Sequence, residues 1–405
     1  MTARVEVNGR RYAAPTAPTA VVCLDGCDPR YLDDAFERAI VPRMAEMAAQ
    51  GVYALGRSQL PSFTNPNNLS IVTGAPPDVH GLPGNHCLAL DGGEVQLDDP
   101  RFLRAPSIHA RLHAAGLPVL AVTTKDKLRR LLAAGDVPCV SVERAGDIPI
   151  DGLDRASDAL ARPVPGIYDW EASPYALELG LALAERLGTR LLYVSLTDFV
   201  QHTEPPGSAL SDRFLRRLDE LVGAFLDRGW RLGLVADHGM NGKTTADGRP
   251  NVRYLSDALA AAGIAGSHVL LPITDPHVVH HAALGSACWV YVSDPADVAR
   301  AAEAIAALAG VEEVLTGDAA ARDLRLPRDR IGDLVVLADT DTVLGKTAAE
   351  HDLSALGAPL RSHGGRHEQA IPLLLSERPS PAGARLLAAG ATNADVHHLL
   401  IGLEA

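Results

Sequence analysis

The length, composition and charge of the chain indicate a globular protein and disfavour several classes of partner. With 405 residues, 47% hydrophobic and 21% charged, the chain is long enough for two to three domains, or for one large domain with an insertion. The formal net charge of −13 argues against nonspecific binding to nucleic acid or to an anionic membrane, because both require clustered Lys and Arg side chains. An anionic substrate would then need a local source of positive charge, such as a metal.

The N-terminal residues and the cysteines lead us to expect a cytoplasmic protein. No apolar run resembles a signal peptide, and none approaches the roughly 18 residues of a membrane span. The five cysteines are odd in number and lack the paired spacing of a zinc knuckle, so we expect reduced, mostly buried thiols. They are Cys23, Cys27, Cys87, Cys139 and Cys288.

Short apolar runs predict the strands of a parallel sheet. The runs cover residues 19–24, 117–124, 190–197 and 231–236. Helical patterns rich in Ala and Leu lie between them, over residues 41–51, 177–188 and 213–229. This alternation predicts an α/β fold with a mostly parallel sheet between two layers of helices.

The pattern changes between residues 251 and 345, where we predict a small α+β cap. The predicted elements there are two paired strands within 277–292, a helix over 296–310 and a strand over 332–339.

The two remaining parts of the chain, residues 1–250 and 346–405, are predicted to form one metal-binding catalytic core. The apolar run at 370–376 returns to the main sheet in this prediction, and residues 394–403 form the last helix.

Three of the predicted strands lead into acidic residues. The first precedes Asp25, the third precedes Asp198, and the fourth precedes Asp237 and His238. The carboxyl ends of parallel strands meet at one edge of a sheet, where such folds bind ligands, so these carboxylates are expected to converge. If "DFVQH" forms a helical turn, Asp198 and His202 lie on the same face of it.

A further histidine stands in "RSHGGRHEQA". His363 is our ligand candidate there, and His367 is kept as a substitute or as a group that supports a ligand. Carboxylate and imidazole groups together suit zinc or another borderline divalent metal better than calcium. The candidate ligands are enough for two metals, as in a two-metal hydrolase: Asp25, Asp198, Asp237, His202, His238 and His363.

A nucleophile is available in "LPSFTNPNNLSIVTG". Thr64 precedes a predicted helix start, with Asn65 as the cap and Pro66 as the first helical residue. The N-terminus of a helix also presents amide donors to a phosphoryl group. A threonine hydroxyl needs a metal or a base to lose its proton, so we expect Thr64 to bind one of the metals. A simple capping turn is the alternative interpretation.

The motifs "LDGCDP", "SFTNPNN", "GLPGNH", "TDFVQH", "ADHGM" and "SHGG" together resemble the alkaline phosphatase superfamily, and within it the phosphonoacetate hydrolases of the nucleotide pyrophosphatase/phosphodiesterase-like branch. The resemblance spans residues 19–370 in the expected order. It implies an alkaline-phosphatase-like fold with two zinc ions per subunit. It also implies cleavage of the carbon–phosphorus bond of phosphonoacetate to acetate and phosphate.

The resemblance also implies roles for individual residues. One zinc is surrounded by Asp25, Thr64, Asp237 and His238. The other zinc is held by Asp198, His202 and His363. Arg366 and His367 are a polar pair that the resemblance leaves unassigned.

The rare lysines independently favour an anionic organic substrate. Only four of the 37 basic residues are lysines, and Lys125 and Lys127 lie at the end of the second predicted strand, on the same sheet edge as the metals. They are expected to hold the substrate carboxylate, and the resemblance adds Asn85 as a donor to a phosphoryl oxygen. His280 and His281 are further candidates in the cap, near the substrate.

Two other functions stay open. A phosphodiesterase or nucleotide pyrophosphatase would use the same fold and metals. A non-catalytic metal-binding relative is disfavoured because every expected position is filled. We expect a small phosphonate as the partner, with neither nucleic acid nor membrane, and a homodimer is kept open.

Overall fold

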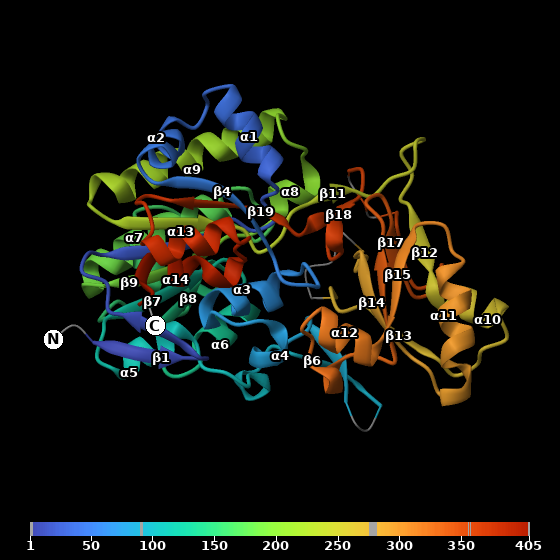
Figure 1. The fold of residues 1–405 in the computed structure, drawn as a ribbon. Coiled ribbons are helices and arrows are strands. Elements are labelled where there is room, and N and C mark those ends of the chain that lie inside the picture. The colour runs from blue at the N-terminus through green and yellow to red at the C-terminus, as the bar shows by residue number, and fades with distance from the viewer. Residues whose placement is uncertain (1–2, 90–91, 275–281, 355, 357, 404–405) are drawn as a thin grey trace.

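A seven-stranded sheet forms the centre of the molecule. The computed structural model describes residues 3–89, 92–274, 282–354, 356 and 358–403 (Figure 1). The strand order is β4 (Val52–Arg57), β19 (Ala370–Leu375), β10 (Arg231–Val235), β3 (Thr19–Cys23), β9 (Leu191–Ser195), β7 (Val119–Thr123) and β8 (Cys139–Ser141). All pairs from β10 to β8 are parallel, whereas β19 is antiparallel to both of its neighbours.

The predicted strands of the core are confirmed, including the return of the run at 370–376 to the main sheet. Their continuous apolar sequences follow from burial on both faces: every residue of β3, β7 and β9 is buried. Alternate residues of β9 show which helices cover each face. Gly180 of α7 (Ala172–Leu187) packs against Val194 on one face. On the other face, Tyr193 contacts the rings of His109 in α5 (Ile108–Ala114) and His397 in α14 (Val396–Ile401).

Helices occupy the predicted positions between the strands. Those predicted are α2 (Pro42–Gln50), α7, α9 (Ala209–Asp227) and the last helix α14 (Val396–Ile401). Ser208 starts α9 by accepting a hydrogen bond from the Ser211 amide, and Gly188, with φ of 60°, ends α7. Other helices in the described part of the chain are α1 (Pro29–Glu37), α3 (Thr64–Thr73), α4 (Pro77–His80), α5 (Ile108–Ala114), α6 (Asp126–Leu132), α8 (Phe199–Thr203), α10 (Leu255–Ala261) and α13 (Pro381–Ala388).

A second, antiparallel sheet lies beside the core, on the right of Figure 1. Its order is β13 (His268–Leu270), β14 (Ala287–Tyr291), β16 (Leu334–Ala338) and β15 (Val311–Thr316). Helices α11 (Val298–Ala306) and α12 (Gly317–Asp323) pack on β15. The predicted helix at 296–310 and strand at 332–339 are therefore found. The limits of the cap at 251 and 345 stay a prediction.

The predicted strand pair within 277–292 is wrong in the part that the structure describes. Only β14 is a strand there, and its partners are β13 and β16. Ala282 and Ala283 adopt φ of 50° and 59°, a left-handed conformation that cannot continue an extended strand. Residues 277–281, with His280 and His281, lie outside the described residues.

Short strand pairs complete the fold. The pairs are β1 (Arg4–Val7) with β2 (Arg10–Ala13), β5 (His86–Leu88) with β6 (Glu94–Gln96), β11 (Asn241–Gly242) with β18 (Arg361–Ser362), and β12 (Val252–Tyr254) with β17 (Val343–Gly345). Within the described ranges, no helix has the length and apolar character that crossing a membrane requires. All five cysteines are free thiols, and all but Cys139 are buried, as the sequence predicted.

Candidate active site

Three buried carboxylates meet at the carboxyl edge of the central sheet. Asp25 follows β3, Asp198 follows β9, and Asp237 follows β10. Their exposed fractions are 1%, 2% and 0%. The site contains two overlapping groups of possible metal ligands, and Asp198 belongs to both. Within each group, the ligand atoms lie within 4.8 Å of one another. The groups are Asp198 with His202 and His363, and Asp25 with Asp198 and His238.

The first group combines a helical turn with a distant loop. Asp198 and His202 stand four residues apart at helix α8, and Oδ2 of Asp198 lies 3.0 Å from Nε2 of His202. His363 directly follows β18, and its Nε2 lies 3.8 Å from the same oxygen. Gly364, with φ of 122°, packs so closely on Phe63 that a Cβ would lie 2.3 Å from its ring. The loop after His363 therefore needs a glycine there.

The second group surrounds His238. Its Nε2 lies 3.3 Å from Oδ1 of Asp25 and 3.7 Å from Oδ2 of Asp237. The Asp237 carboxylate also accepts hydrogen bonds from the amides of Gly26 and His238 and from Nδ2 of Asn68. Asp237 is thus held rigidly at the border of the group.

All three histidines point the same ring nitrogen into the site. Nδ1 lies 2.9 Å from the Gly239 carbonyl in His238, 2.8 Å from the Arg361 carbonyl in His202, and 2.7 Å from the Ser62 carbonyl in His363. Because a carbonyl can only accept, each ring donates from Nδ1, and in its neutral form it keeps the lone pair on Nε2. This is the arrangement that metal-binding histidines adopt.

The buried carboxylates leave the site short of positive charge, as the pKa of Asp25 indicates. Burial, followed by the charges of Asp198 and Asp237, raises the pKa of Asp25 well above its ordinary value. Burial lowers the pKa of His238, but the neighbouring carboxylates outweigh it and raise this pKa to about 9. Burial and the two nearby imidazoles lower the pKa of His363 well below its ordinary value.

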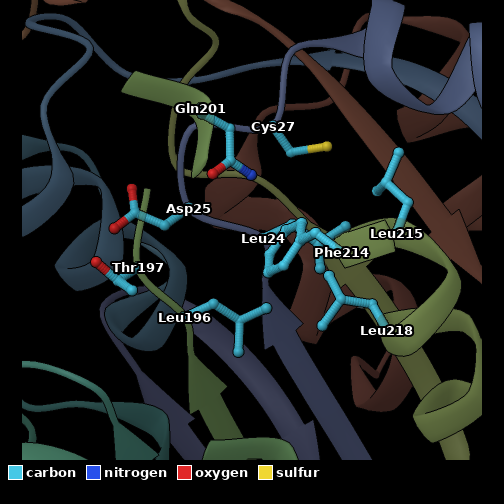
Figure 2. Close-up of a pocket in the computed structure, with 9 residues that line it drawn as sticks. All are labelled: Leu24, Asp25, Cys27, Leu196, Thr197, Gln201, Phe214, Leu215 and Leu218. Carbon is cyan, nitrogen blue, oxygen red and sulfur yellow. The ribbon is translucent and has the colours of Figure 1, made fainter. Parts of the chain in front are cut away.

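An apolar layer behind Asp25 explains its desolvation. Figure 2 shows Asp25 and Thr197 at the edge of a small pocket that is closed by Leu24, Leu196 and side chains of α9. In the part of the chain that the structure describes, neither carboxylate oxygen of Asp25 has a hydrogen-bond partner. A buried carboxylate without a hydrogen-bond partner, beside imidazole rings that direct Nε2 into the site, fits divalent metal ions of the zinc type.

Thr64 borders this site, but the helix begins earlier than predicted. The cap is Phe63 rather than Asn65, and Thr64 is the first residue of α3 instead of preceding the helix. The side chain of Asn67 contacts the carbonyls of Gln59, Pro61 and Phe63, which fixes the preceding loop in this position. Pro66 is tolerated because the first-turn amides have no partner within the helix. Oγ1 of Thr64 lies 3.2 Å from Nε2 of His238.

Asn68 is a site residue that the sequence analysis missed. Its Nδ2 donates to the Thr64 carbonyl at 2.9 Å and to Oδ2 of Asp237 at 3.1 Å. Its Oδ1 accepts from the Tyr193 hydroxyl at 2.6 Å. The repeated asparagines of "SFTNPNN" were the available signal, because buried amides need several partners.

The candidate substrate-binding residues approach from β7 and from the loop before β5. Lys125 and Lys127 are both 7% exposed, and Nζ of Lys125 lies 3.1 Å from Oδ1 of Asp198. Nδ2 of Asn85 donates to the Ile273 carbonyl at 3.1 Å, while its buried Oδ1 has no partner among the described residues. Asn85 therefore ties the site to the segment that leads away from β13.

Arg366 and His367 lie outside the site. Arg366 pairs with Glu313, and Nε2 of His367 lies 2.9 Å from Oε2 of Glu312, so both residues attach the loop after His363 to β15. The option of His367 as a substitute ligand is wrong, because its side chain is turned to this surface pair. His363 instead takes the inward position, where its ring stacks on that of His238, and Gly364, with φ of 122°, follows it directly.

Comparison with known proteins decides the family. The family described as type I phosphodiesterase / nucleotide pyrophosphatase matches residues 19–367. The chain belongs to this family. Phosphonoacetate hydrolase from Sinorhizobium meliloti 1021, in its complex with phosphonoformate, is 40% identical to this chain, with a TM-score of 0.91 and 98% of each chain covered. Its complex with phosphonoacetate is 39% identical, with the same TM-score and coverage.

Two further relatives extend this picture. A phosphonoacetate hydrolase from Penicillium oxalicum is 73% identical over 30 residues, and the match spans 7% of this chain and 42% of that relative. Murine ectonucleotide pyrophosphatase / phosphodiesterase 5 is 16% identical with a TM-score of 0.61, covers 90% of this chain and 88% of its own, and shares the fold alone. The predicted alkaline-phosphatase-like α/β fold and the prediction of a hydrolase are confirmed by these family relationships.

Proposed function

We propose that this hydrolase of the phosphodiesterase / nucleotide pyrophosphatase family cleaves phosphonoacetate to acetate and phosphate. The observation that carries the proposal is the 40% identity over 98% of the chain to a phosphonoacetate hydrolase. The buried Lys125 and Lys127 support it, because a carboxylate-bearing substrate needs cations beside the phosphoryl site.

We propose two zinc ions per subunit as the cofactors. One would be held by Asp25, Thr64, Asp237 and His238, and the other by Asp198, His202 and His363. Asp198 stands in both groups of converging ligand atoms. When bound, divalent ions favour loss of the Thr64 hydroxyl proton and offset the negative charge of the phosphoryl group.

Thr64 is the proposed nucleophile. Its position as the first residue of α3 places the hydroxyl at the positive end of a helix whose first amides lack partners within the helix. Asn68 holds the Thr64 backbone and Asp237 together, so the nucleophile and a proposed ligand keep one geometry. The phosphoryl group would therefore meet a preset oxygen and preset amide donors.

The reaction proceeds in two displacements. Oγ1 of Thr64, after its proton has left to solvent, bonds to phosphorus while the carbon–phosphorus bond breaks. The electron pair of that bond passes to the substrate carbon and is delocalised into the carboxylate, and protonation by water gives acetate. A water molecule then attacks phosphorus, which releases phosphate and restores the Thr64 hydroxyl.

The lysines and Asn85 are proposed to orient the substrate. Lys125 and Lys127 hold the carboxylate and stabilise the negative charge that develops on it as the bond breaks. The remaining N–H of the Asn85 amide donates to a phosphoryl oxygen, since its other N–H is directed to the Ile273 carbonyl.

A phosphodiesterase of the same family is the second candidate. The description of the matched family favours it, because it names phosphodiesterase and pyrophosphatase activities. An alkoxide leaving group would make little use of the two buried lysines, and this distinguishes the candidates.

The decisive experiment measures phosphate release from phosphonoacetate by the zinc-loaded protein, beside 4-nitrophenyl phosphodiester and monoester substrates. We expect preferred turnover of phosphonoacetate, loss of it in Thr64→Ala, and partial retention in the matched Thr64→Ser variant. Diester turnover with phosphonoacetate untouched would overturn the proposed substrate and keep the nucleophile.

We also propose that the enzyme acts in the cytoplasm on a small phosphonate, without a nucleic-acid or membrane partner. The five free thiols support a reducing compartment.

A further inference from the structure

The two loops that carry His238 and His363 run side by side. Strands β11 and β18 pair in an antiparallel register, with Asn241 opposite Ser362. His238 precedes this pair and His363 follows it, and their rings stack with centroids 3.6 Å apart and planes 7° apart. His238 and His363 belong to different candidate metal groups, so this stacking relates the two groups to each other.

Glu368 makes hydrogen bonds to both loops. Its backbone carbonyl accepts from the amide of Gly239, directly after His238, at 2.7 Å. Its Oε2 accepts from the amide of Gly365, two residues after His363, at 3.0 Å. The side chain is fully buried, at 0% exposed, and Nδ2 of Asn241 donates to its Oε1 at 2.7 Å.

Lys243 compensates the charge of Glu368 and extends the connection to the second sheet. Its Nζ donates to Oε1 of Glu368 at 2.9 Å and to the carbonyl of Thr340, after β16, at 2.7 Å. The Lys243 side chain is also 0% exposed. One buried ion pair therefore joins both histidine loops and the second sheet.

Stability alone is a weak reason for such a pair. Burying two charges costs as much desolvation as the pair returns, and apolar residues of similar size often stabilise a protein equally well. A buried pair whose polar atoms are all hydrogen-bonded does, however, restrict the conformations available to the loops that it joins. Here those loops hold two of the three imidazoles of the site.

We infer that Lys243 and Glu368 are positioning residues that fix His238 against His363 and thereby set the relation between the two metal groups. The inference rests on the proposed metal-dependent hydrolase. Neither residue contacts the substrate in this scheme, and both act through the two histidines.

The main test replaces both charges at once. The double variant Lys243→Met, Glu368→Gln leaves no unpaired buried charge, so it is expected to fold. Cobalt(II) is loaded in place of zinc, and the visible absorption spectrum, the metal atoms bound per chain, and kcat and KM for phosphonoacetate are compared with the parent protein. We expect an altered cobalt spectrum, weaker metal binding, and kcat lower by roughly 10- to 100-fold with little change in KM.

A matched control breaks another ion pair with a buried carboxylate. Nη1 of Arg10 lies 2.7 Å from Oδ1 of Asp395, which is 5% exposed, between β2 and the start of α14. Arg10→Met should lower the melting temperature and leave the cobalt spectrum, metal content and kcat of the folded protein unchanged. This pattern separates loss of stability from loss of positioning.

A second variant, Glu368→Asp, keeps the charge pair with Lys243 but shortens the reach to Gly365. This variant is expected to fold and to show the same change of the cobalt spectrum as the double variant. If the double variant does not fold, Glu368→Asp alone tests the inference. Parent-like cobalt spectra and kcat in either folded variant would overturn the inference. If the parent protein binds two cobalt ions but leaves phosphonoacetate intact, only the proposed substrate fails, and the spectra still test the pair.

Discussion

Oγ1 of Thr64 lies 3.2 Å from Nε2 of His238, although 174 positions separate the two residues in the chain. The start of α3 supplies the first atom, and the loop after β10 supplies the second. A hydroxyl at a helix N-terminus thus meets a group of carboxylates and imidazoles, as the proposed metal-assisted displacement at phosphorus requires.

Asp198 should contribute more to metal binding than Asp25, because its carboxylate belongs to both groups of ligand atoms. We expect Asp198→Ala to bind less than one zinc per chain and Asp25→Ala to keep one. Both should lose activity by about 10³-fold or more. Metal analysis by mass spectrometry after gel filtration measures this, and equal zinc contents in the two variants would contradict the larger contribution of Asp198.

Replacing Lys125 should affect phosphonoacetate more than an aryl phosphodiester. A charge-assisted hydrogen bond contributes about 1.5–3 kcal/mol, so kcat/KM for phosphonoacetate should fall roughly 10- to 100-fold in Lys125→Gln. Lys346→Gln is the matched control, because Nζ of Lys346 pairs with Glu94 at 2.8 Å instead of with the site. Equal losses on both substrates would exclude a role for Lys125 in carboxylate recognition.

Removing the amide of Asn68 should slow the reaction without abolishing metal binding. Asn68→Ala loses the hydrogen bonds that hold the Thr64 carbonyl and Asp237, at a cost of about 1–3 kcal/mol. We expect kcat to fall about 10-fold or more and Tyr193→Phe, which removes one hydrogen bond to Asn68, to have a smaller effect. Steady-state kinetics of the two zinc-loaded variants provide the measurement. An unchanged kcat in Asn68→Ala would argue against a role of Asn68 in holding Thr64 and Asp237 in place.

Metal removal should destabilise the fold, because it leaves three buried carboxylates close together. Zinc at 100 times its dissociation constant stabilises a single site by about 2.7 kcal/mol. Thermal unfolding with a chelator and after addition of zinc should show a lower and then a restored melting temperature. Calcium, which prefers oxygen ligands alone, should restore it poorly. A chelator without effect on the melting temperature would count against bound metal in the purified protein.

Buried histidines away from the site should make the protein sensitive to mild acid. Burial lowers the pKa of His80 to about 3 and that of His397 to about 4. Below about pH 6.5 the unfolded chain binds protons that these folded rings do not, so the free energy of unfolding falls as the pH decreases. Each ring should remove about 2 kcal/mol between pH 7 and pH 5.

Urea unfolding of the parent protein and of His397→Asn at the two pH values isolates the contribution of one ring. The variant should show the smaller loss of stability on acidification, even if it is less stable at pH 7. An identical pH dependence in both proteins would show that His397 takes up a proton in the folded state.

The sequence by itself determined the positions of the core strands and of the acidic residues behind them. Continuous apolar runs identify strands that are buried on both faces, and a parallel sheet directs their carboxyl ends to one edge. Asp25, Asp198 and Asp237 could therefore be expected to converge, and the four-residue spacing brought His202 to Asp198. These inferences need only local periodicity and one rule of topology.

Only the tertiary structure decided which distant groups face one another. It placed His363 against Asp198 and His238, started α3 at Thr64 instead of after Asn65, directed His367 to Glu312, and paired β14 with β13 and β16. It also showed the contacts of Asn68, Lys243 and Glu368. Such contacts depend on how buried polar groups find partners across the packed core, and residues far apart in the chain carry no local pattern that specifies those partners.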